Sequence, residues 1–416
     1  MKRIAPLPSP VKIELDGHPV SAREGEPVAC ALLAAGETVF SRSPKYHRPR
    51  GPFCLEGACA QCLMRVDGVP NIATCRVAVR PGMRLERQNA YPTAKFDIFA
   101  ATDWFFPRGL NHHELFAGVP VAEKVMARVA RQLAGLGKLP DAPAAAPAAP
   151  VELRTGVAIV GAGPAGLAAA AELGSDFLLF EREPEVGGRL RREPIEADAP
   201  AVGTPANVRL GTPVIGCFAD DQGLFLAANK SGQLLKVRAR TLLFCNGGMP
   251  QLIPFEGNDL PGVFAGRAVS ALVRVHGVVP GPVVACVGEP SAARALAALL
   301  ESVGAKPVAV GAEPVAAHGT NAVSAITVRV DGREEKVSCD AVALCAPASP
   351  SFELASQAGA HVSFRPEHGL FTVDADADGR TSVPEVRVAG ELLGPMSAAR
   401  AAESGRRAAR AIRGAP

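Results

Sequence analysis

The chain has 416 residues, a length that predicts two or three domains. Charged residues make up 20% of it and the formal net charge is +3, without long basic runs, so nucleic acid is not expected as a partner. The first ten residues lack the apolar run of a signal peptide, and no stretch approaches 18 uninterrupted apolar residues, so no transmembrane segment is expected. These features predict a globular protein of the cytosol.

Short apolar runs surround a group of cysteines in the N-terminal part. Two Asp-Gly pairs, Asp16-Gly17 and Asp67-Gly68, each join two alternating runs and are typical of tight β-hairpin turns. Residues 27–35 read as a short helix, and a further strand is expected near 71–79. Small strands around one helix and a metal loop predict a β-grasp, ferredoxin-like domain over residues 1–95.

Four of the ten cysteines lie close together, which in a long chain indicates a metal site rather than a disulfide framework. Cys54-x4-Cys59-x2-Cys62 has the plant-type [2Fe-2S] spacing, and Cys75 supplies a fourth ligand. Gly57 and Ala58, between the first two cysteines, keep the loop small and let backbone N–H groups approach the cluster's sulfides. Four cysteines also satisfy tetrahedral zinc, but zinc ligands usually come as two separated pairs. The other cysteines are expected to be small core residues: Cys30, Cys217, Cys245, Cys286, Cys339 and Cys345.

A helical connector and a linker are expected between the N-terminal domain and the rest of the chain, over residues 96–150. Residues 121–136 have the apolar periodicity of an amphipathic helix. Residues 141–150 form a Pro/Ala tract that favours extended polyproline conformation. This tract is the clearest predicted boundary in the chain.

A dinucleotide-binding turn follows the linker. The strand at 157–160 leads into Gly161-Ala-Gly163-Pro-Ala-Gly166 and then into a helix, so that a diphosphate would lie at the helix N-terminus. A carboxylate, Glu181, ends the next strand, where it can accept hydrogen bonds from ribose hydroxyls. The predicted ligands in this region are Gly161, Gly163, Pro164, Ala165, Gly166, Glu181 and Arg182.

A second glycine pair, Gly187-Gly188, precedes Arg189 and lets the chain pass close to a cofactor, as flavin proteins need. It favours FAD, with NAD as the alternative at the same site. Two strand ends, at 242–248 and 383–390, are expected to return to this cofactor. These segments contribute the predicted ligands Gly188, Arg189, Gly247, Gly390 and Glu391.

Strands and Ala-rich helices alternate from residue 156 onward, which predicts parallel sheets covered by helices. We predict a Rossmann-like FAD-binding domain from residues 151–280 and 381–416, and a second, degenerate nucleotide-binding domain at 281–380. In the second domain Glu289 stands where a pyrophosphate would approach, and its charge repels phosphate. NAD(P)H is therefore not expected to bind there. The predicted fold class is α+β and α/β: a ferredoxin-like domain before a two-dinucleotide-binding-domain flavoprotein.

Two further segments carry a family resemblance: Tyr46-His-Arg-Pro-Arg-Gly51 before the cysteine loop, and Val66-Asp-Gly-Val-Pro-Asn71 after it. With the turn at 161–190 and Asn258-Asp-Leu-Pro-Gly262, they resemble the N-terminal part of the α subunit of heterotetrameric sarcosine oxidase. Related subunits of hydrogen cyanide synthase and of opine and hydroxyproline dehydrogenases are similar. Most of the chain is covered by this resemblance.

The resemblance implies a complex in which a partner flavin subunit of the D-amino-acid-oxidase type oxidises a C–N bond and this chain relays the electrons. It implies cluster ligands at Cys54, Cys59, Cys62 and Cys75. The chain stops near residue 416, so the folate-binding module of sarcosine oxidase is not expected. Only about seventeen residues separate Leu190 from Val208, fewer than the family usually has, so part of the lid on the flavin side is not expected either. No general base is assigned. A self-sufficient NAD(P)H-dependent reductase and a structural nucleotide-holding subunit are the alternatives.

Overall fold

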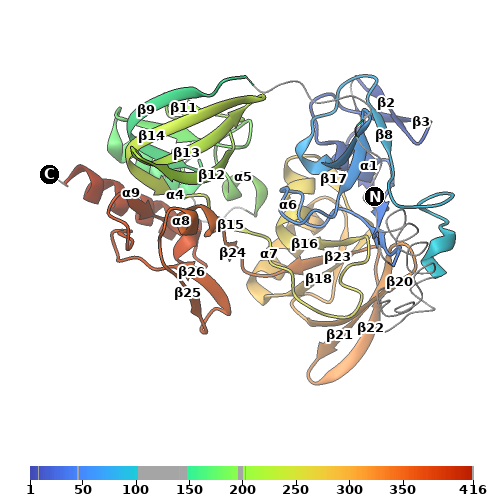
Figure 1. The fold of residues 1–416 in the computed structure, drawn as a ribbon. Helices are drawn as coiled ribbons and strands as arrows, with labels where there is room; N and C mark the ends of the chain where they lie inside the picture. Colours follow the sequence, from blue (N-terminus) through green and yellow to red (C-terminus); the bar gives the residue numbers. More distant parts are fainter. Residues whose placement is uncertain are drawn as a thin grey trace, which may run out of the picture. The chain divides into compact units, whose positions relative to one another are not determined.

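The computed structural model describes residues 1–7, 9–44, 46–101, 140, 148–194, 200–201 and 203–414. The chain divides into two compact units, each built from two separate stretches. Unit 1 contains Met1–Ala144 and Leu252–Ala346, and unit 2 contains Ala145–Gln251 and Pro347–Pro416. In Figure 1 unit 1 is blue and yellow to orange, and unit 2 is green and red.

The N-terminal part of unit 1 is a five-stranded sheet, in the order β3-β2-β8-β6-β7, which shares one core with helix α1. Its elements are β2 (Val11–Leu15), β3 (His18–Ala22), α1 (Val28–Ala34), β6 (Leu63–Val66), β7 (Val69–Ala73) and β8 (Arg84–Glu86). Both predicted Asp-Gly turns have positive φ angles, 49° and 83° at Asp16-Gly17 and 47° and 80° at Asp67-Gly68. The two hairpins therefore form where the turn residues indicate.

The strand expected at 71–79 is shorter in the structure. Strand β7 ends at Ala73, and a 3-10 turn, η1 (Thr74–Arg76), follows and carries Cys75. Thr74 turns the chain because both its backbone N–H and its hydroxyl donate to the carbonyl of Cys62, at 3.2 and 2.7 Å. Three other short strands and one turn complete this part: β1 (Lys2–Arg3), β4 (Ser41–Arg42), β5 (Pro49–Arg50) and η2 (Ile98–Ala100).

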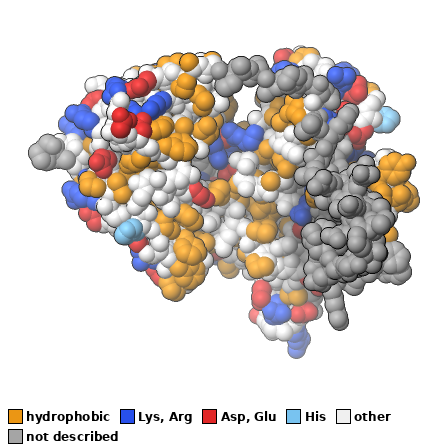
Figure 2. Space-filling view, viewed as in Figure 1, with side chains coloured by type: hydrophobic (Ala, Val, Ile, Leu, Met, Phe, Trp, Pro, Cys, Tyr) orange, Lys and Arg blue, Asp and Glu red, His pale blue; other side chains and the backbone are white. Residues whose placement is uncertain are grey.

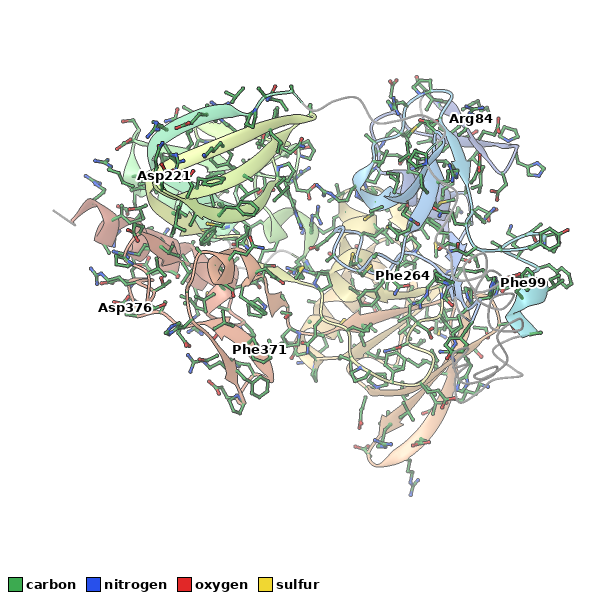
Figure 3. The ribbon with its side chains drawn as sticks, in the orientation of Figure 1. Arg84, Phe99, Asp221, Phe264, Phe371 and Asp376 are labelled. Carbon is green, nitrogen blue, oxygen red and sulfur yellow. The ribbon has the colours of Figure 1, made fainter. Side chains whose placement is uncertain are left out.

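The second part of unit 1 is a parallel sheet in the order β16-β23-β18-β19. Its elements are β16 (Val263–Ala265), α6 (Gly266–Arg274), β17 (Val278–Val279), β18 (Val283–Gly288), α7 (Pro290–Ser302), β19 (Lys306–Val308) and β23 (Ala341–Cys345). An antiparallel sheet of β20 (Glu313–Gly319), β21 (Val323–Val330) and β22 (Arg333–Ser338) follows β19. Phe264 on β16 is fully buried in the core that both parts of unit 1 share (Figure 3).

Unit 2 is built on a seven-stranded sheet, in the order β11-β10-β9-β14-β13-β12 with β27 beside β14. Its strands are β9 (Val151–Val160), β10 (Phe177–Phe180), β11 (Val208–Arg209), β12 (Val214–Asp220), β13 (Gly223–Lys230), β14 (Gln233–Phe244) and β27 (Val386–Val388). The pairs that involve β9, β10, β11 and β27 are parallel, whereas β12, β13 and β14 form an antiparallel meander. The carboxyl ends of β9, β10, β14 and β27 therefore meet at one edge of the sheet.

Two helices of unit 2 pack closely. Helix α4 (Pro164–Leu173) follows β9, and α9 (Ala398–Arg413) crosses it at Gly405, where an added Cβ would lie 2.0 Å from the carbonyl oxygen of Ala165. The remaining elements are α5 (Arg189–Arg192), β15 (Gly248–Met249), β24 (Ser349–Pro350), α8 (Glu353–Gln357), β25 (Val362–Arg365), β26 (Leu370–Val373) and η3 (Gly390–Leu393).

The two units divide the C-terminal half differently from the predicted domains. Residues 252–280, expected in the FAD-binding domain, belong to unit 1, because β16 pairs with β23 and α6 packs behind it. Residues 347–380, expected in the second domain, belong to unit 2, because α8 and β26 pack into the core of the large sheet. The strand pairing of β16 depends on tertiary contact and has no local signal in the sequence.

The predicted amphipathic helix at 121–136 and most of the connector and linker at 96–150 lie outside the described residues. Among the residues that are described, no helix has the length and apolar character needed to cross a membrane. On the face shown in Figure 2, basic and acidic side chains are interspersed among apolar ones.

Candidate cofactor-binding sites

The cysteine loop runs from the end of β5 to the start of β6 and makes several sharp turns. Leu55, Gly57 and Ala60 have φ angles of 53°, 80° and 52°. At Gly57 an added Cβ would lie 2.9 Å from the side-chain carbons of Arg76, so this arginine packs directly on the loop. The positive φ at Gly57 and this close approach explain why a glycine stands between the first two cysteines.

The four predicted metal ligands come together. The side chain of Cys54 forms hydrogen bonds with those of Cys59 and Cys75, and Cys62 also bonds to Cys75. Cys54, Cys62 and Cys75 are buried and Cys59 is half-buried. Among the described residues no three of His, Cys, Asp and Glu surround a position for a single metal ion. The four cysteine side chains instead form a connected series of contacts, from Cys59 through Cys54 and Cys75 to Cys62.

Sulfur contacts and backbone donors give two of these thiols the character of thiolates. Hydrogen bonds from Cys59 and Cys75 lower the pKa of Cys54 to about 2, against the effect of burial, with help from the N–H groups of Glu56 and Ala58. The hydrogen bond from Cys75 likewise lowers the pKa of Cys62 to about 7. The partners that donate, Cys59 and Cys75, have raised pKa values for the same reason.

These residues fit a [2Fe-2S] cluster. Cysteines bind iron as thiolates, and here three come from one tight loop and the fourth from η1. The N–H of Glu56 donates to the Sγ atom of Cys54 at 3.3 Å, the kind of N–H···S bond that tunes cluster potentials. Cys59, the most exposed of the four, lies on the side of the site that faces solvent.

The nucleotide turn lies between β9 and α4, and its three glycines have different surroundings. Gly161 has a φ of 100°, and an added Cβ would lie 2.5 Å from the carbonyl oxygen of Cys245. At Gly166 the added Cβ would lie 1.9 Å from the carbonyl oxygen of Gly161. At Gly163 it would meet nothing within 4 Å. The turn thus packs tightly against other backbone at Gly161 and Gly166, whereas Gly163 leaves open space in which a pyrophosphate can approach.

The predicted ribose ligand lies beside this turn. Glu181 is buried at the end of β10, and its carboxylate accepts from the N–H of Ala162 at 2.7 Å and of Glu183 at 2.9 Å. The side chain of Arg182 is 42% exposed, and its Nε atom lies 3.4 Å from the carboxylate of Glu183. Pro164 and Ala165 form the first turn of α4, and proline suits that position because its missing N–H would have no helical partner.

Segments far apart in the sequence gather around the turn. Gly188, with a φ of 52°, approaches it so closely that an added Cβ would lie 3.0 Å from the Cα of Gly163. The guanidinium of Arg189 lies 2.9 Å from the carboxylate of Glu391. At Gly247 an added Cβ would lie 3.5 Å from the same carboxylate, and at Gly390 it would lie 3.0 Å from the Cβ of Ala165. Except for Arg182, the predicted ligands therefore form one constellation.

One residue of this constellation was not among the predicted ligands. Asn246 lies between the end of β14 and Gly247, and its Cα would be 3.0 Å from a Cβ added at Gly161. Its side-chain N–H donates to the carbonyl of Ser351 at 2.7 Å, while its Oδ1 atom is buried and has no hydrogen-bond partner among the described residues. A buried acceptor beside the glycine turn fits a bound dinucleotide that supplies the donor. A polar residue directly after the apolar run 242–245 was the signal available in the sequence.

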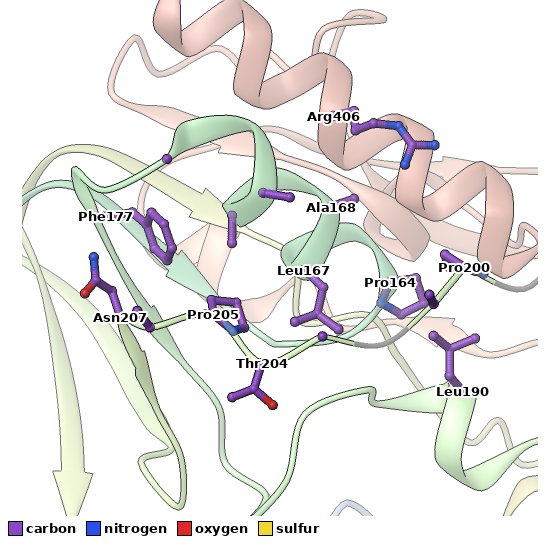
Figure 4. Close-up of a pocket in the computed structure, with 16 residues that line it drawn as sticks. Pro164, Leu167, Ala168, Phe177, Leu190, Pro200, Thr204, Pro205, Asn207 and Arg406 are labelled. Atoms are coloured by element: carbon purple, nitrogen blue, oxygen red, sulfur yellow. The ribbon is translucent and has the colours of Figure 1, made fainter.

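A hollow of about 520 Å³ borders the turn at Pro164 and runs along α4 (Figure 4). Its described lining is mostly apolar and includes Leu167, Phe177 and Leu190, with Thr204, Asn207 and Arg406 as polar members. Arg406 donates to Glu403 at 2.8 Å. The hollow suits an apolar group rather than a phosphate, so the phosphate position remains at the turn.

In unit 1 the turn between β18 and α7 corresponds to the nucleotide turn, and residues of the chain itself occupy it. Glu289 caps α7: its carboxylate accepts from the N–H groups of Ser291 and Ala292, at 3.0 and 2.7 Å, and from the hydroxyl of Ser291 at 2.7 Å. The loop after β19 lies against it, with the N–H of Gly288 donating to Ala312 at 2.9 Å. At Gly311 an added Cβ would lie 3.2 Å from Pro290. A carboxylate thus holds the helix N–H groups that a pyrophosphate would need.

Two family models match the chain at these two places. Residues 8–90 match the 2Fe-2S iron-sulfur cluster binding domain, and residues 159–216 match the NAD(P)-binding Rossmann-like domain. The predicted cofactor classes, an iron-sulfur cluster and a dinucleotide, are therefore confirmed. So is the predicted fold class, a ferredoxin-like domain followed by a Rossmann-like flavoprotein fold.

Curated proteins resemble the chain, one of them along most of its length and another over a shorter segment. Sarcosine oxidase subunit alpha of Rhizobium meliloti is 28% identical over 430 residues, which cover 89% of this chain and 43% of that protein. The chain thus spans less than half the length of this relative. Hydrogen cyanide synthase subunit HcnA of Pseudomonas aeruginosa is 40% identical over 77 residues, which cover 18% of this chain and 73% of HcnA.

A solved structure shares the fold. The L-proline dehydrogenase from P. horikoshii superposes with a TM-score of 0.75 at 21% identity, over 99% of this chain and 75% of that one. The family assignment rests on the sequence relatives, because a shared fold alone does not establish a function. The chain belongs to the family of oxidoreductase subunits that includes sarcosine oxidase subunit alpha and hydrogen cyanide synthase subunit HcnA.

Proposed function

We propose that the chain is the electron-transfer subunit of a multi-subunit oxidoreductase that acts on an amine or amino acid. A partner flavin subunit of the D-amino-acid-oxidase type would remove electrons from the substrate's C–N bond, and this chain would pass them to an acceptor. The observation that carries the proposal is that one chain holds four converging cysteine sulfurs and a complete, open glycine turn. The thiols require a reducing compartment, so we place the chain in the cytosol.

The protein's own residues would hold and orient the two cofactors. Bound [2Fe-2S] and FAD supply one-electron and two-electron redox chemistry. Cys54, Cys59, Cys62 and Cys75 would bind the iron. Gly163 leaves space for the diphosphate, and Glu181 would exchange part of its contact with Ala162 for ribose hydroxyls.

FAD rather than NAD is our proposal for the turn of unit 2. Gly188 brings a second stretch of backbone against Gly163, and Gly247 and Glu391 line the continuation of the same site. A flavin dinucleotide is long enough to use both the turn and this continuation. NAD at the same position is the outcome that would change the assignment.

The test is the cofactor content of protein purified without oxygen. Iron and sulfide assays should give the ratio of a [2Fe-2S] cluster, and chromatography of the acid-released nucleotide should give FAD in equimolar amount to the chain. Zinc without sulfide would overturn the cluster, and NAD or no nucleotide would overturn the flavin. A C54S variant is the matched control, because it removes one buried sulfur and should lose iron while it keeps the nucleotide.

A self-sufficient NAD(P)H-dependent reductase is the second candidate. The capped turn at Glu289 argues against it, because the helix N–H groups that bind a pyrophosphate already have a carboxylate partner. Anaerobic mixing with NADH or NADPH should therefore leave the flavin spectrum unchanged within the time of a turnover. Rapid bleaching would support the reductase instead.

A further inference from the structure

The start of helix α6 contacts the cysteine loop. Strand β16 ends at Ala265, whose N–H donates to the carbonyl of Phe53 at 3.1 Å. Helix α6 begins at the next residue, and Arg267 lies in its first turn. The Nε atom of Arg267 lies 3.8 Å from the Oε1 atom of Glu56. The junction of β16 and α6 thus contacts the loop both before and after Cys54.

Glu56 connects this junction to the sulfur. Its backbone N–H donates to the Sγ atom of Cys54 at 3.3 Å, and its side chain reaches Arg267. The side chains of Glu56 and Arg267 are 6% and 12% exposed. Because water is largely excluded, their charges act on the sulfur with less screening than surface charges would.

We propose that Arg267 is a positioning residue for the cluster loop and that its ion pair with Glu56 sets the reduction potential at Cys54. The proposal rests on the proposed function, since it requires the cluster to be present. Reduction adds one electron to the site and neither makes nor breaks a bond. The added negative charge is disfavoured by the carboxylate of Glu56 and favoured by the guanidinium and by the positive end of α6. The opposite charges of the pair therefore act on the site in opposite directions.

Three variants test the pair. R267Q removes the positive charge beside the carboxylate of Glu56 and should lower the equilibrium constant for reduction roughly tenfold, about 59 mV for one electron. E56Q keeps the backbone N–H and removes the negative charge beside the guanidinium of Arg267, so it should shift the potential in the opposite direction. The double variant E56Q/R267Q should return to near the wild-type value. Each holoprotein is titrated anaerobically with dithionite, and the EPR signal of the reduced state gives the midpoint potential.

A matched control separates this effect from a general change of charge. R329Q removes the same charge from the same compact unit, at an exposed arginine that lies 2.9 Å from Glu313 on the β20–β21 hairpin. It should leave the midpoint potential unchanged. R267K, which retains the charge, should stay close to wild type.

The outcomes distinguish this inference from the proposed function. If wild-type holoprotein carries no iron and sulfide, the proposed function fails. If the wild-type cluster is present and R267Q leaves its potential unchanged, or if R267Q and E56Q shift it in the same direction, only the role of the ion pair is overturned. Loss of iron from R267Q with retention in R267K supports the positioning role, whereas equal loss from both contradicts it.

Discussion

Gly163 and Gly166 lie in the same turn but in different surroundings. An added Cβ at Gly166 would lie 1.9 Å from the carbonyl oxygen of Gly161, a backbone atom that cannot move aside cheaply. At Gly163 the same Cβ would enter open space. Gly166 is therefore required for packing, and Gly163 for the approach of a ligand.

The variants G166A and G163A separate these two roles. G166A should lower the free energy of unfolding by about 1–3 kcal/mol, because the added methyl forces the helix away from the turn. G163A should leave stability within about 0.5 kcal/mol and weaken dinucleotide binding. Urea unfolding followed by circular dichroism and a binding titration measure the two effects. Equal stability of both variants would contradict the packing role of Gly166.

A second prediction concerns Arg42, which is 5% exposed and donates to three acceptors. Its guanidinium bonds to the carbonyls of Ala94 and His47 and to the Oδ1 atom of Asn321, at 2.7–2.9 Å. R42K keeps the charge but cannot reach all of these acceptors, so it should cost about 1.5–3 kcal/mol in urea unfolding. R48K is the control at a half-exposed arginine, with an expected change within about 0.5 kcal/mol. Similar losses of stability in R42K and R48K would show that the buried hydrogen bonds of the Arg42 guanidinium do not stabilise the fold.

At the scale of an element, helix α7 shows how a nucleotide turn can become a structural cap. The carboxylate of Glu289 satisfies N–H groups at the helix start that would otherwise have no intrahelical partner. Burial opposes its ionisation, but the hydrogen bonds from Ala292 and Ser291 outweigh that effect and lower the pKa of Glu289. The ionised form therefore stabilises the folded state.

E289A should cost about 0.5–2 kcal/mol of stability at pH 7. Because the folded-state pKa is lowered, the contribution of Glu289 is complete above the usual pKa of a glutamate and is lost as the pH falls through the lowered value. The difference in Tm between wild type and E289A should be the same at pH 6 and pH 8 and shrink in acid. E301A, at the exposed end of the same helix, should show no such loss. A difference that persists in acid would contradict the cap.

At the scale of the whole molecule, the two predicted cofactor sites belong to different compact units. The four cysteines lie in unit 1, and the constellation around Gly161 lies in unit 2. Each unit has its own buried core. Occupation of one site is therefore expected to depend little on the other.

Loss of one site should leave the other intact. C75S should abolish iron and sulfide, while dinucleotide affinity stays within about twofold of wild type, as for independent sites. G163A should show the reverse pattern, with reduced dinucleotide binding and normal iron content. Iron assay and nucleotide titration on both variants provide the measurement. Loss of both cofactors in either variant would mean that the units do not fold independently.

Short-range patterns predicted the local features of both sites. The spacing of Cys54, Cys59 and Cys62 and the turn Gly161–Gly166 act within one loop, and the Asp-Gly hairpins need only their own φ angles. The helix after the turn and the strands on either side follow from apolar periodicity in the same way. These features depend on neighbours in the chain, so the sequence alone is sufficient to determine them.

Contacts between distant residues were decided only by the tertiary structure. The pairing of β16 with β23 places residues 252–280 in unit 1. Strand β14 brings to the glycine turn the Oδ1 atom of Asn246, which has no hydrogen-bond partner in the part of the chain that the structure describes. Arg267 reaches Glu56 across more than two hundred residues of sequence. Neither apolar periodicity nor the spacing of residues predicts such contacts, because they depend on which faces of the helices and strands pack together in the core.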